Sequence, residues 1–194
     1  MQFPLSFRFK ILGLAPQIYV YDASGGEVAY VKQKLFKLRE QIEVFTSSAR
    51  SEKVADIQAD RILDHSATYH FRRGDHDLGA VRRKGWRSIF KAEYHLLDTR
   101  GEHELTVTED SALVKVFDSL VGEIPFIGFL LTMLINPSYS VRTHDGDVLF
   151  RIHKRPAFFE GKFDVERVRD VDDDLEERVL LGVMMMLLLE RTRG

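Results

Sequence analysis

The last part of the chain is apolar on every side, and this feature limits the possible folds more than any other. Residues Val179 to Leu189 read VLLGVMMMLLL and are bounded by charged residues at both ends. A helix that is apolar all round must be enclosed by other structure. Because a bilayer crossing needs about 20 apolar residues, this run is too short to span a membrane. We therefore expect a helix that is buried inside the rest of the protein.

Charged residues indicate where this helix begins and ends. Asp174 has a side chain suited to an N-cap, and Glu177 stands three places further on, which is the spacing of a capping box. Arg191 and Arg193 follow the apolar run, where the helix dipole favours positive charge. The sequence therefore predicts a helix capped by Asp174.

Almost everything upstream of the helix has the pattern of short β-strands. Turn-forming stretches such as DASGGE, RRGDHD and HDGD recur at short intervals. Between them lie twelve runs with strand character: 3–9, 18–21, 28–33, 42–45, 54–59, 67–71, 78–83, 86–97, 104–108, 139–143, 148–153 and 161–168. Residues 111–120 have helical spacing instead, and 35–38 are too few to classify.

Regularly spaced short strands are typical of an antiparallel sandwich or barrel. Together with the enclosed helix they predict a mainly β (α+β) protein in which sheet surrounds a central C-terminal helix. No linker rich in Pro, Gly or Ser divides the chain, so we expect residues 1–194 to form a single domain.

Composition restricts the partners of the protein. The formal net charge of −2 argues against general binding to nucleic acid or to an anionic membrane, so any basic site must be local. The chain has no cysteine, which excludes disulfides and thiolate metal sites and fits a reducing cytoplasm. The N-terminal residues lack the basic and apolar regions of a signal peptide. We therefore expect a cytoplasmic protein.

Several stretches resemble a known family. They are FPLSFRFKILGLAPQIYVYD, YVKQKLFKLRE, ADRILDHSATYHF, LGAVRRKGWRSIFKAEY, GEIPFIGF, NPSY, FFEGKF and LLERTRG. They are similar to the LURP-one-related branch of the tubby C-terminal-like superfamily, which is linked structurally to the phospholipid scramblases. The resemblance implies a closed antiparallel barrel of about twelve strands around an apolar C-terminal helix. It also suggests a non-enzymatic module that recognises phospholipid headgroups or a membrane surface as a peripheral membrane protein.

One segment is rich in positive charge and is the candidate for lipid binding. The candidate residues are Arg72, Arg73, Arg82, Arg83, Lys84, Arg87 and Lys91. Basic side chains of this kind can gather lipid phosphates, and Trp86 lies among them. The alternative is the ordinary solvated face of an antiparallel sheet, which is the more common case. Strand alternation would place Arg82 and Lys84 on the face opposite Arg83.

A second segment, residues 120–135, is apolar but contains Glu123 and Pro125. It could be a helix that covers the barrel, a shallow membrane-inserting element or a dimer interface. In the last case Phe126, Phe129 and Leu130 are the candidate interface residues. The alternative function is therefore a protein-interaction scaffold, forming a homo-oligomer through this segment.

The sequence contains no catalytic motif, so we predict no enzyme, no cofactor and no metal. The seven histidines lack metal-binding spacing, and we expect scattered exposed or capping roles for them. An acidic run at 170–176 invites comparison with a calcium-linked segment of the scramblases. It lacks the glycine and glutamate of an EF-hand loop. We favour helix capping for these residues, while calcium binding stays open.

Overall fold

The computed structural model describes residues 1–10, 16–34, 41–61, 67–84, 93–110, 138–156 and 160–191. Within these ranges the chain forms twelve strands and one helix. The strands are β1 (Leu5–Lys10), β2 (Gln17–Tyr21), β3 (Glu27–Lys34), β4 (Gln41–Phe45), β5 (Lys53–Ala59), β6 (Thr68–Arg73), β7 (His76–Arg83), β8 (Glu93–Leu97), β9 (His103–Glu109), β10 (Ser138–Arg142), β11 (Val148–Arg155) and β12 (Glu160–Arg167). The helix is α3 (Asp173–Arg191).

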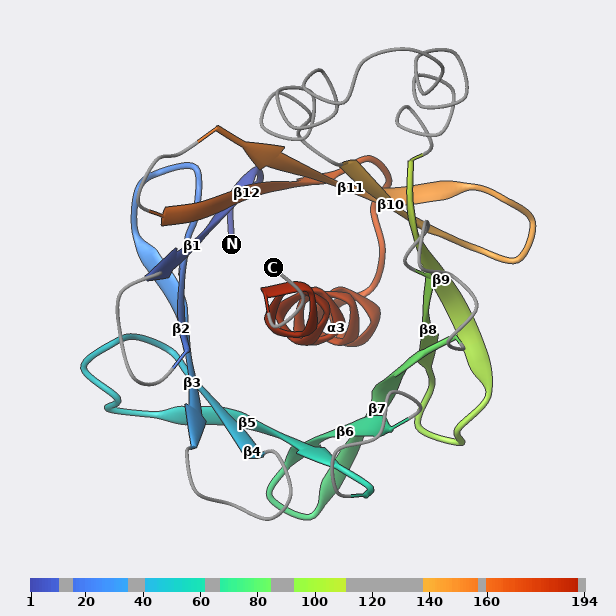
Figure 1. The fold of residues 1–194 in the computed structure, drawn as a ribbon, viewed down its shortest axis with the longest axis horizontal. Helices are drawn as coiled ribbons and strands as arrows, with labels where there is room; N and C mark the ends of the chain where they lie inside the picture. Colours follow the sequence, from blue (N-terminus) through green and yellow to red (C-terminus); the bar gives the residue numbers. More distant parts are fainter. Residues whose placement is uncertain are drawn as a thin grey trace, which may run out of the picture.

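The strands close into a single barrel. Each strand pairs antiparallel with its neighbour in sequence, and β12 pairs with β1 to complete the ring. Figure 1 shows this ring with α3 inside it. Closure leaves no strand edge unpaired, which removes the main hazard of an exposed sheet. The predicted mainly β class, with a closed antiparallel barrel of twelve strands around a central C-terminal helix, is thus confirmed.

Alternation along each strand builds the inner wall of the barrel. On β2, Ile18 and Val20 are buried while the residues between and beside them are partly exposed. Ile42 and Val44 repeat the pattern on β4. This period of two is what a sheet with one solvated face requires. All twelve predicted strands are present, although the one predicted at 86–97 is described only from Glu93 onward.

The apolar run of α3 fills the barrel. Every residue from Val179 to Leu188 is buried, so the expectation of a fully enclosed helix is confirmed. The helix belongs to one apolar cluster with inward side chains of the strands. Its closest approaches are to β6, β7 and β8. The large rings of Phe7 and Phe150 belong to the same cluster on β1 and β11.

Two glycines permit the close approach of the helix to β7 and β8. A Cβ atom at Gly182 of α3 would overlap the side chain of Leu96 on β8. A Cβ atom at Gly79 of β7 would overlap the carbonyl oxygen of Leu97 and lie 2.7 Å from Nε of Arg178. Gly79 also has φ of +106°, a conformation that side-chain-bearing residues rarely adopt. Gly79 therefore requires glycine both for packing and for its backbone, whereas a side chain at Gly182 would require Leu96 to move.

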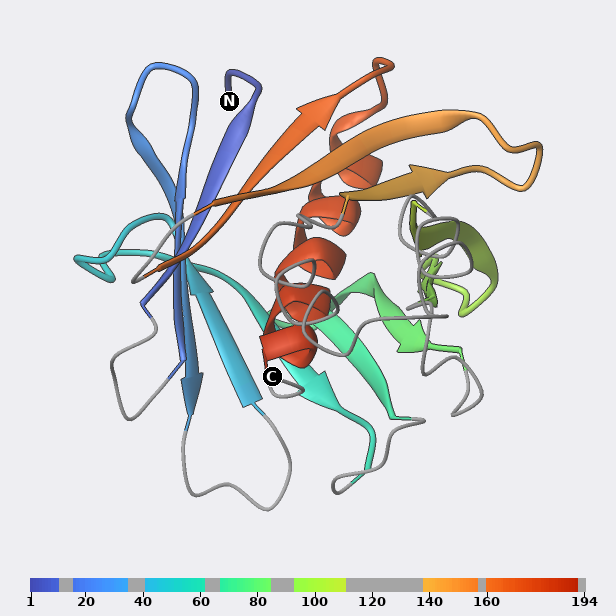
Figure 2. The ribbon, with the colours of Figure 1, turned by 45° about the horizontal axis from the view of Figure 1, so that its top comes forward.

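The two ends of the barrel differ. Tight turns at 22–26, 46–52, 74–75, 98–102 and 143–147 all lie at one end, together with the N-terminus of α3. We call this the turn end. The opposite end, where β7 leads through Lys84 and β8 begins at Glu93, is called the Lys84 end. Figure 2 shows α3 running from the turn end toward the opposite end.

The predicted N-cap of the helix is wrong by two residues. Asp172 is the cap, because its Oδ1 accepts a hydrogen bond from the Leu175 amide at 2.8 Å and its carbonyl accepts one from the Glu176 amide at 2.9 Å. Glu177 does not close a capping box and instead pairs with Arg73 on β6. Because several aspartates precede the helix, side-chain type alone does not single out the cap. The predicted segments 35–38 and 111–120 lie outside the described residues.

Candidate functional site

The structure separates the predicted basic residues into two groups. Arg72 and Arg73 end β6 beside the turn at 74–75, whereas Arg82, Arg83 and Lys84 come at the other end of β7. In the β6–β7 register, Arg73 lies opposite His76 and Thr68 lies opposite Arg82. The two groups are therefore at opposite ends of one hairpin, about 20 Å apart. Arg87 and Lys91, with Trp86, lie outside the described residues.

Within the second group the side chains point to different faces, as alternation predicts. Arg82 and Lys84 are exposed, while Arg83 is half-buried and lies on the same face as the buried Val81. Lys84 Nζ pairs with Oε1 of Glu93 at 2.9 Å. Arg82 and Arg83 form no ion pair with any residue in the described parts of the chain. Within the described residues, neither guanidinium group is neutralised by a carboxylate.

Histidine side chains lie beside Arg82 on the outer wall, on the strands that follow β7. In the strand register, Arg82 lies opposite His95 on β8, and His95 lies opposite Thr106 on β9. The ring of His95 stacks on that of His103, with centroids 3.9 Å apart and planes 9° from parallel. His144, in the β10–β11 turn, meets His103 edge-on at 4.6 Å. We call Arg82, Lys84, His95, His103 and His144 the basic–histidine strip.

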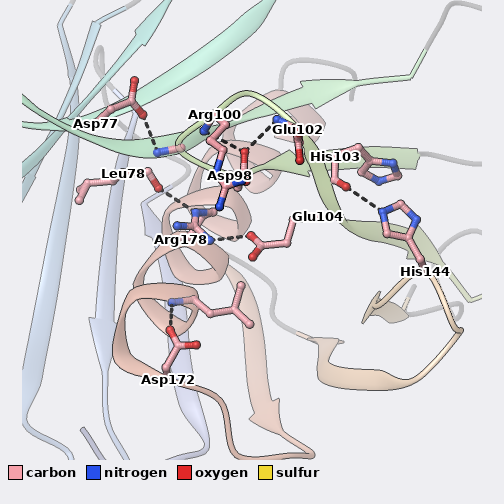
Figure 3. Close-up of polar contacts among 12 residues, drawn as sticks. Asp77, Leu78, Asp98, Arg100, Glu102, His103, Glu104, His144, Asp172 and Arg178 are labelled. Carbon is pink, nitrogen blue, oxygen red and sulfur yellow. Dashed lines mark hydrogen bonds and ion pairs between the residues drawn. The ribbon is translucent and has the colours of Figure 1, made fainter.

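Hydrogen bonds fix the rings of this strip. His95 Nε2 lies 3.0 Å from Oε1 of Glu93, the same oxygen that binds Lys84. His103 Nε2 lies 3.0 Å from the Leu105 carbonyl oxygen. His144 Nε2 donates to the His103 carbonyl at 2.7 Å, as Figure 3 shows. Since carbonyl and carboxylate oxygens only accept, each Nε2 carries the proton in these bonds.

Two pKa shifts describe the electrostatics of the strip. Burial lowers the pKa of His103, and the neighbouring His95 and His144 lower it further. Burial would raise the pKa of Glu93, but the hydrogen bonds from His95 and Lys84 outweigh this and hold it below its ordinary value. Glu93 is therefore ionised at neutral and mildly acidic pH, while the fold favours the neutral form of His103.

The expectation of scattered histidines is thus wrong for three of the seven. Sequence spacing did not reveal the cluster, because His144 is far from the other two in sequence. In addition, the register shift between Leu96 and Leu97 brings His103 beside His95. Such a bulge changes which side chains meet across a hairpin. The presence of two histidines flanking the 98–102 turn was the only signal available.

A second polar cluster lies inside the barrel near the turn end and anchors the helix. Arg178 is buried, its Nε donates to the Leu78 carbonyl at 2.9 Å, and its Nη1 binds Oε2 of Glu104 at 2.5 Å. We call Arg178, Glu104 and Leu78 the helix clamp. Figure 3 shows Glu104 directed toward Arg178, whereas the adjacent His103 lies near His144. The clamp and the strip thus use neighbouring residues of β9.

Three of the acidic residues at 170–176 are engaged in protein contacts. Asp172 caps α3, and Oδ1 of Asp170 lies 3.3 Å from Nη2 of Arg167. Arg167 also pairs with Glu176 at 2.7 Å. Among the residues with described positions, no set of three or more His, Asp or Glu side chains is arranged to hold a metal ion.

The predicted interface residues Phe126, Phe129 and Leu130 fall within 111–137, outside the described residues, so the interface stays a prediction. In the parts of the chain that are described, no helix has the length and apolarity needed to cross a membrane.

The fold and site define the protein as a closed twelve-strand barrel filled by its own C-terminal helix, with a basic and histidine-rich strip on the outer wall. Comparison with known proteins adds no narrower identity: no family model, no curated protein and no solved structure matches the chain.

Proposed function

We propose that the protein is a non-enzymatic module that binds anionic phospholipid headgroups at a membrane surface, through the basic side chains at its Lys84 end. The observation that carries this proposal is the pair Arg82 and Arg83, which have no carboxylate partner among the described residues. Two other basic residues near this end are neutralised, since Lys34 forms an ion pair with Glu43 at 2.8 Å and Arg155 forms one with Asp164 at 2.7 Å. Unpaired guanidinium groups bind phosphate oxygens well.

The filled barrel supports a site on the outside. The helix residues Val179 to Leu188 are buried against the inner wall, so they occupy the space that a small apolar ligand would need. A lipid ligand is therefore expected at the outer surface, where its headgroup rather than its acyl chain is recognised. Basic residues attract such headgroups by about 1 kcal/mol each.

Charge along the barrel axis supports one orientation. The turn end includes many carboxylates, among them Asp22, Asp98, Asp147 and the aspartates before α3. Arg82, Arg83 and Lys84 lie at the other end, and the sequence places Arg87 and Lys91 directly after them. An anionic surface repels the first end and attracts the second, which favours docking by the Lys84 end.

The architecture is also the one expected from the resemblance to LURP-one-related proteins, and we propose kinship with the tubby C-terminal-like superfamily on that basis. The lack of cysteine fits action in the cytoplasm as a peripheral membrane protein.

Vesicle co-sedimentation tests the proposal. The probe is phosphatidylcholine vesicles with and without phosphatidylglycerol, at low and at physiological salt. We expect binding only to the anionic vesicles, weakened by salt. The variant Arg82→Glu/Lys84→Glu should lose at least about thirtyfold in affinity, which corresponds to two charges at about 1 kcal/mol each. The control Arg72→Glu/Arg100→Glu reverses two arginines at the turn end and should bind nearly as the unaltered protein does.

Failure to bind anionic vesicles at low salt would refute the proposal, as would equal losses in the two variants. The scaffold alternative predicts a different result, in which the protein is a concentration-dependent dimer by light scattering. In that case Phe129→Glu should yield a monomer without affecting vesicle binding.

A further inference from the structure

One carboxylate in the basic–histidine strip is shared by a lysine and a histidine. Oε1 of Glu93 lies 2.9 Å from Nζ of Lys84 and 3.0 Å from Nε2 of His95. With a neutral His95, the negative charge of Glu93 cancels the positive charge of Lys84. When His95 gains a proton, the same carboxylate faces two cations and can cancel only one.

We propose that His95 makes the basic surface responsive to pH, so that mild acid strengthens its attraction for anionic phosphate groups. The inference rests on the proposed function, because it concerns the regulation of that same site. His95 is well placed for this role, since it lies opposite Arg82 across the sheet, and Arg82 has no carboxylate partner among the described residues. A histidine ordinarily changes charge between pH 5 and 8. Protonation of His95 therefore adds a charge beside Arg82 and loosens the hold of Glu93 on Lys84.

The surroundings of His95 include few groups that could absorb the added charge. Arg82 faces it from β7, Glu93 lies on its own strand, and Thr106 faces it from β9. His103 covers its ring at 3.9 Å. Glu93 is therefore the only carboxylate in contact with His95 among the described residues, and it is already engaged by Lys84.

Charged groups that lie near His95 without contacting it belong to neighbouring strands and turns. Arg142 on β10 pairs across the sheet with Thr106, and its Nη2 lies 3.5 Å from Oδ1 of Asp110. Asp145 follows His144 in the β10–β11 turn. Burial and the nearby imidazoles lower the pKa of His103. His103 therefore stays neutral at mildly acidic pH more readily than an ordinary histidine, and we assign the response to His95.

The role of His95 is positional, because its side chain is largely shielded, with 14% exposed. It acts through the charge of the Lys84–Glu93 pair rather than by touching the lipid. Each added positive charge near an anionic surface is worth about a fivefold gain in affinity. The structure thus leads to a specific pH profile of binding.

The test measures binding of the full chain to phosphatidylglycerol-containing vesicles at pH 7.5 and pH 5.5. The phosphodiester of this lipid keeps its charge over that range, so the lipid itself does not titrate. We expect the unaltered protein to bind more tightly at pH 5.5. The variant His95→Gln keeps a donor for Glu93 but cannot gain a proton. Its increase in affinity from pH 7.5 to pH 5.5 should be about fivefold smaller than that of the unaltered protein. The control His76→Gln removes a histidine from the turn end of β7, the strand next to β8, and should keep the gain.

A second variant tests the role of the shared carboxylate. Glu93→Gln should raise affinity at pH 7.5 by about fivefold, because Lys84 is no longer neutralised. Circular dichroism at both pH values confirms that each variant is folded.

The outcomes separate this inference from the proposed function. An acid gain that His95→Gln leaves intact, or that His76→Gln removes equally, would overturn the inference while the binding function stands. So would binding that depends on Arg82 and Lys84 but does not change with pH. No binding at either pH would instead refute the proposed function, and the inference with it.

Discussion

Replacing Arg178 with methionine should lower the free energy of unfolding. The substitution removes the polar contacts of the helix clamp and preserves most of the side-chain volume. The guanidinium of Arg178 is the partner of two groups at once, the Leu78 carbonyl at 2.9 Å and Glu104 Oε2 at 2.5 Å. Its side chain is 10% exposed and that of Glu104 is 35% exposed. Removing it leaves a partly buried carbonyl without this donor and a partly exposed carboxylate without a cation.

The expected cost follows from these exposures. A buried acceptor that loses its partner costs about 1–3 kcal/mol. Removing one member of a fully buried ion pair costs about 3–5 kcal/mol, but water can reach Glu104, so only part of that penalty applies. We therefore expect the free energy of unfolding to fall by about 2–4 kcal/mol. For a chain of this size each kcal/mol lowers the melting temperature by about 2–4 °C.

Urea denaturation followed by circular dichroism measures the loss. The matched control is Arg73→Met, because Arg73 also pairs with a glutamate of the helix, Glu177, but its side chain is 54% exposed. An exposed pair of this kind contributes at most about 1 kcal/mol. In the double variant Arg178→Met/Glu104→Gln the carboxylate is no longer orphaned, so the combined loss should be smaller than the sum of the single losses. Equal small losses in the free energy of unfolding for Arg178→Met and Arg73→Met would refute the idea that the helix clamp stabilises the helix in the barrel.

Two further predictions follow from the same region. Gly79→Ala should destabilise the fold by more than about 2 kcal/mol, because its Cβ would overlap the Leu97 carbonyl and crowd Arg178 at a φ of +106°. Gly74→Ala, with φ of +59° and open space around it, should cost about 1 kcal/mol, and equal unfolding free energies for the two variants would contradict the packing argument. The lowered pKa of His103 means that the unfolded chain takes up a proton more readily than the fold, so stability falls as pH drops below about 6.5. Urea midpoints at pH 7.5 and 5.5 should therefore differ less in His103→Asn than in the unaltered protein, and an unchanged difference would show that His103 is not the group responsible.

Features set by local sequence were predictable. Alternation such as that of Ile18 and Val20 on β2 follows from a period of two, and turn residues mark where each strand stops. The enclosed helix was predictable because an apolar run without a polar face has no other stable environment in water. Together these two signals were enough for the barrel around a helix.

Features set by pairing between distant segments were not predictable. Arg178 and Glu104 are 74 residues apart, and nothing in either local sequence indicates the other. The stacking of His95 and His103 depends on a register shift that no residue pattern marks. Charge density along the sequence suggested one basic cluster, but the hairpin that contains Arg73 and Arg82 places them at opposite ends. Sequence proximity predicts spatial proximity only within a strand or across a turn.

Neighbouring residues on β9 show how the barrel separates stability from binding. Glu104 pairs with Arg178 of the enclosed helix, while His103 stacks with His95 in the basic–histidine strip. Because the helix fills the lumen, side chains that are buried against it contribute to stability and have no access to a ligand. Outward side chains contact solvent and can change with little effect on the core. Substitutions at Glu104 should therefore change the free energy of unfolding and leave the pH dependence of vesicle binding intact, whereas His95→Gln should do the reverse. A variant of either residue that altered both properties together would mean that the two faces of the barrel wall are coupled.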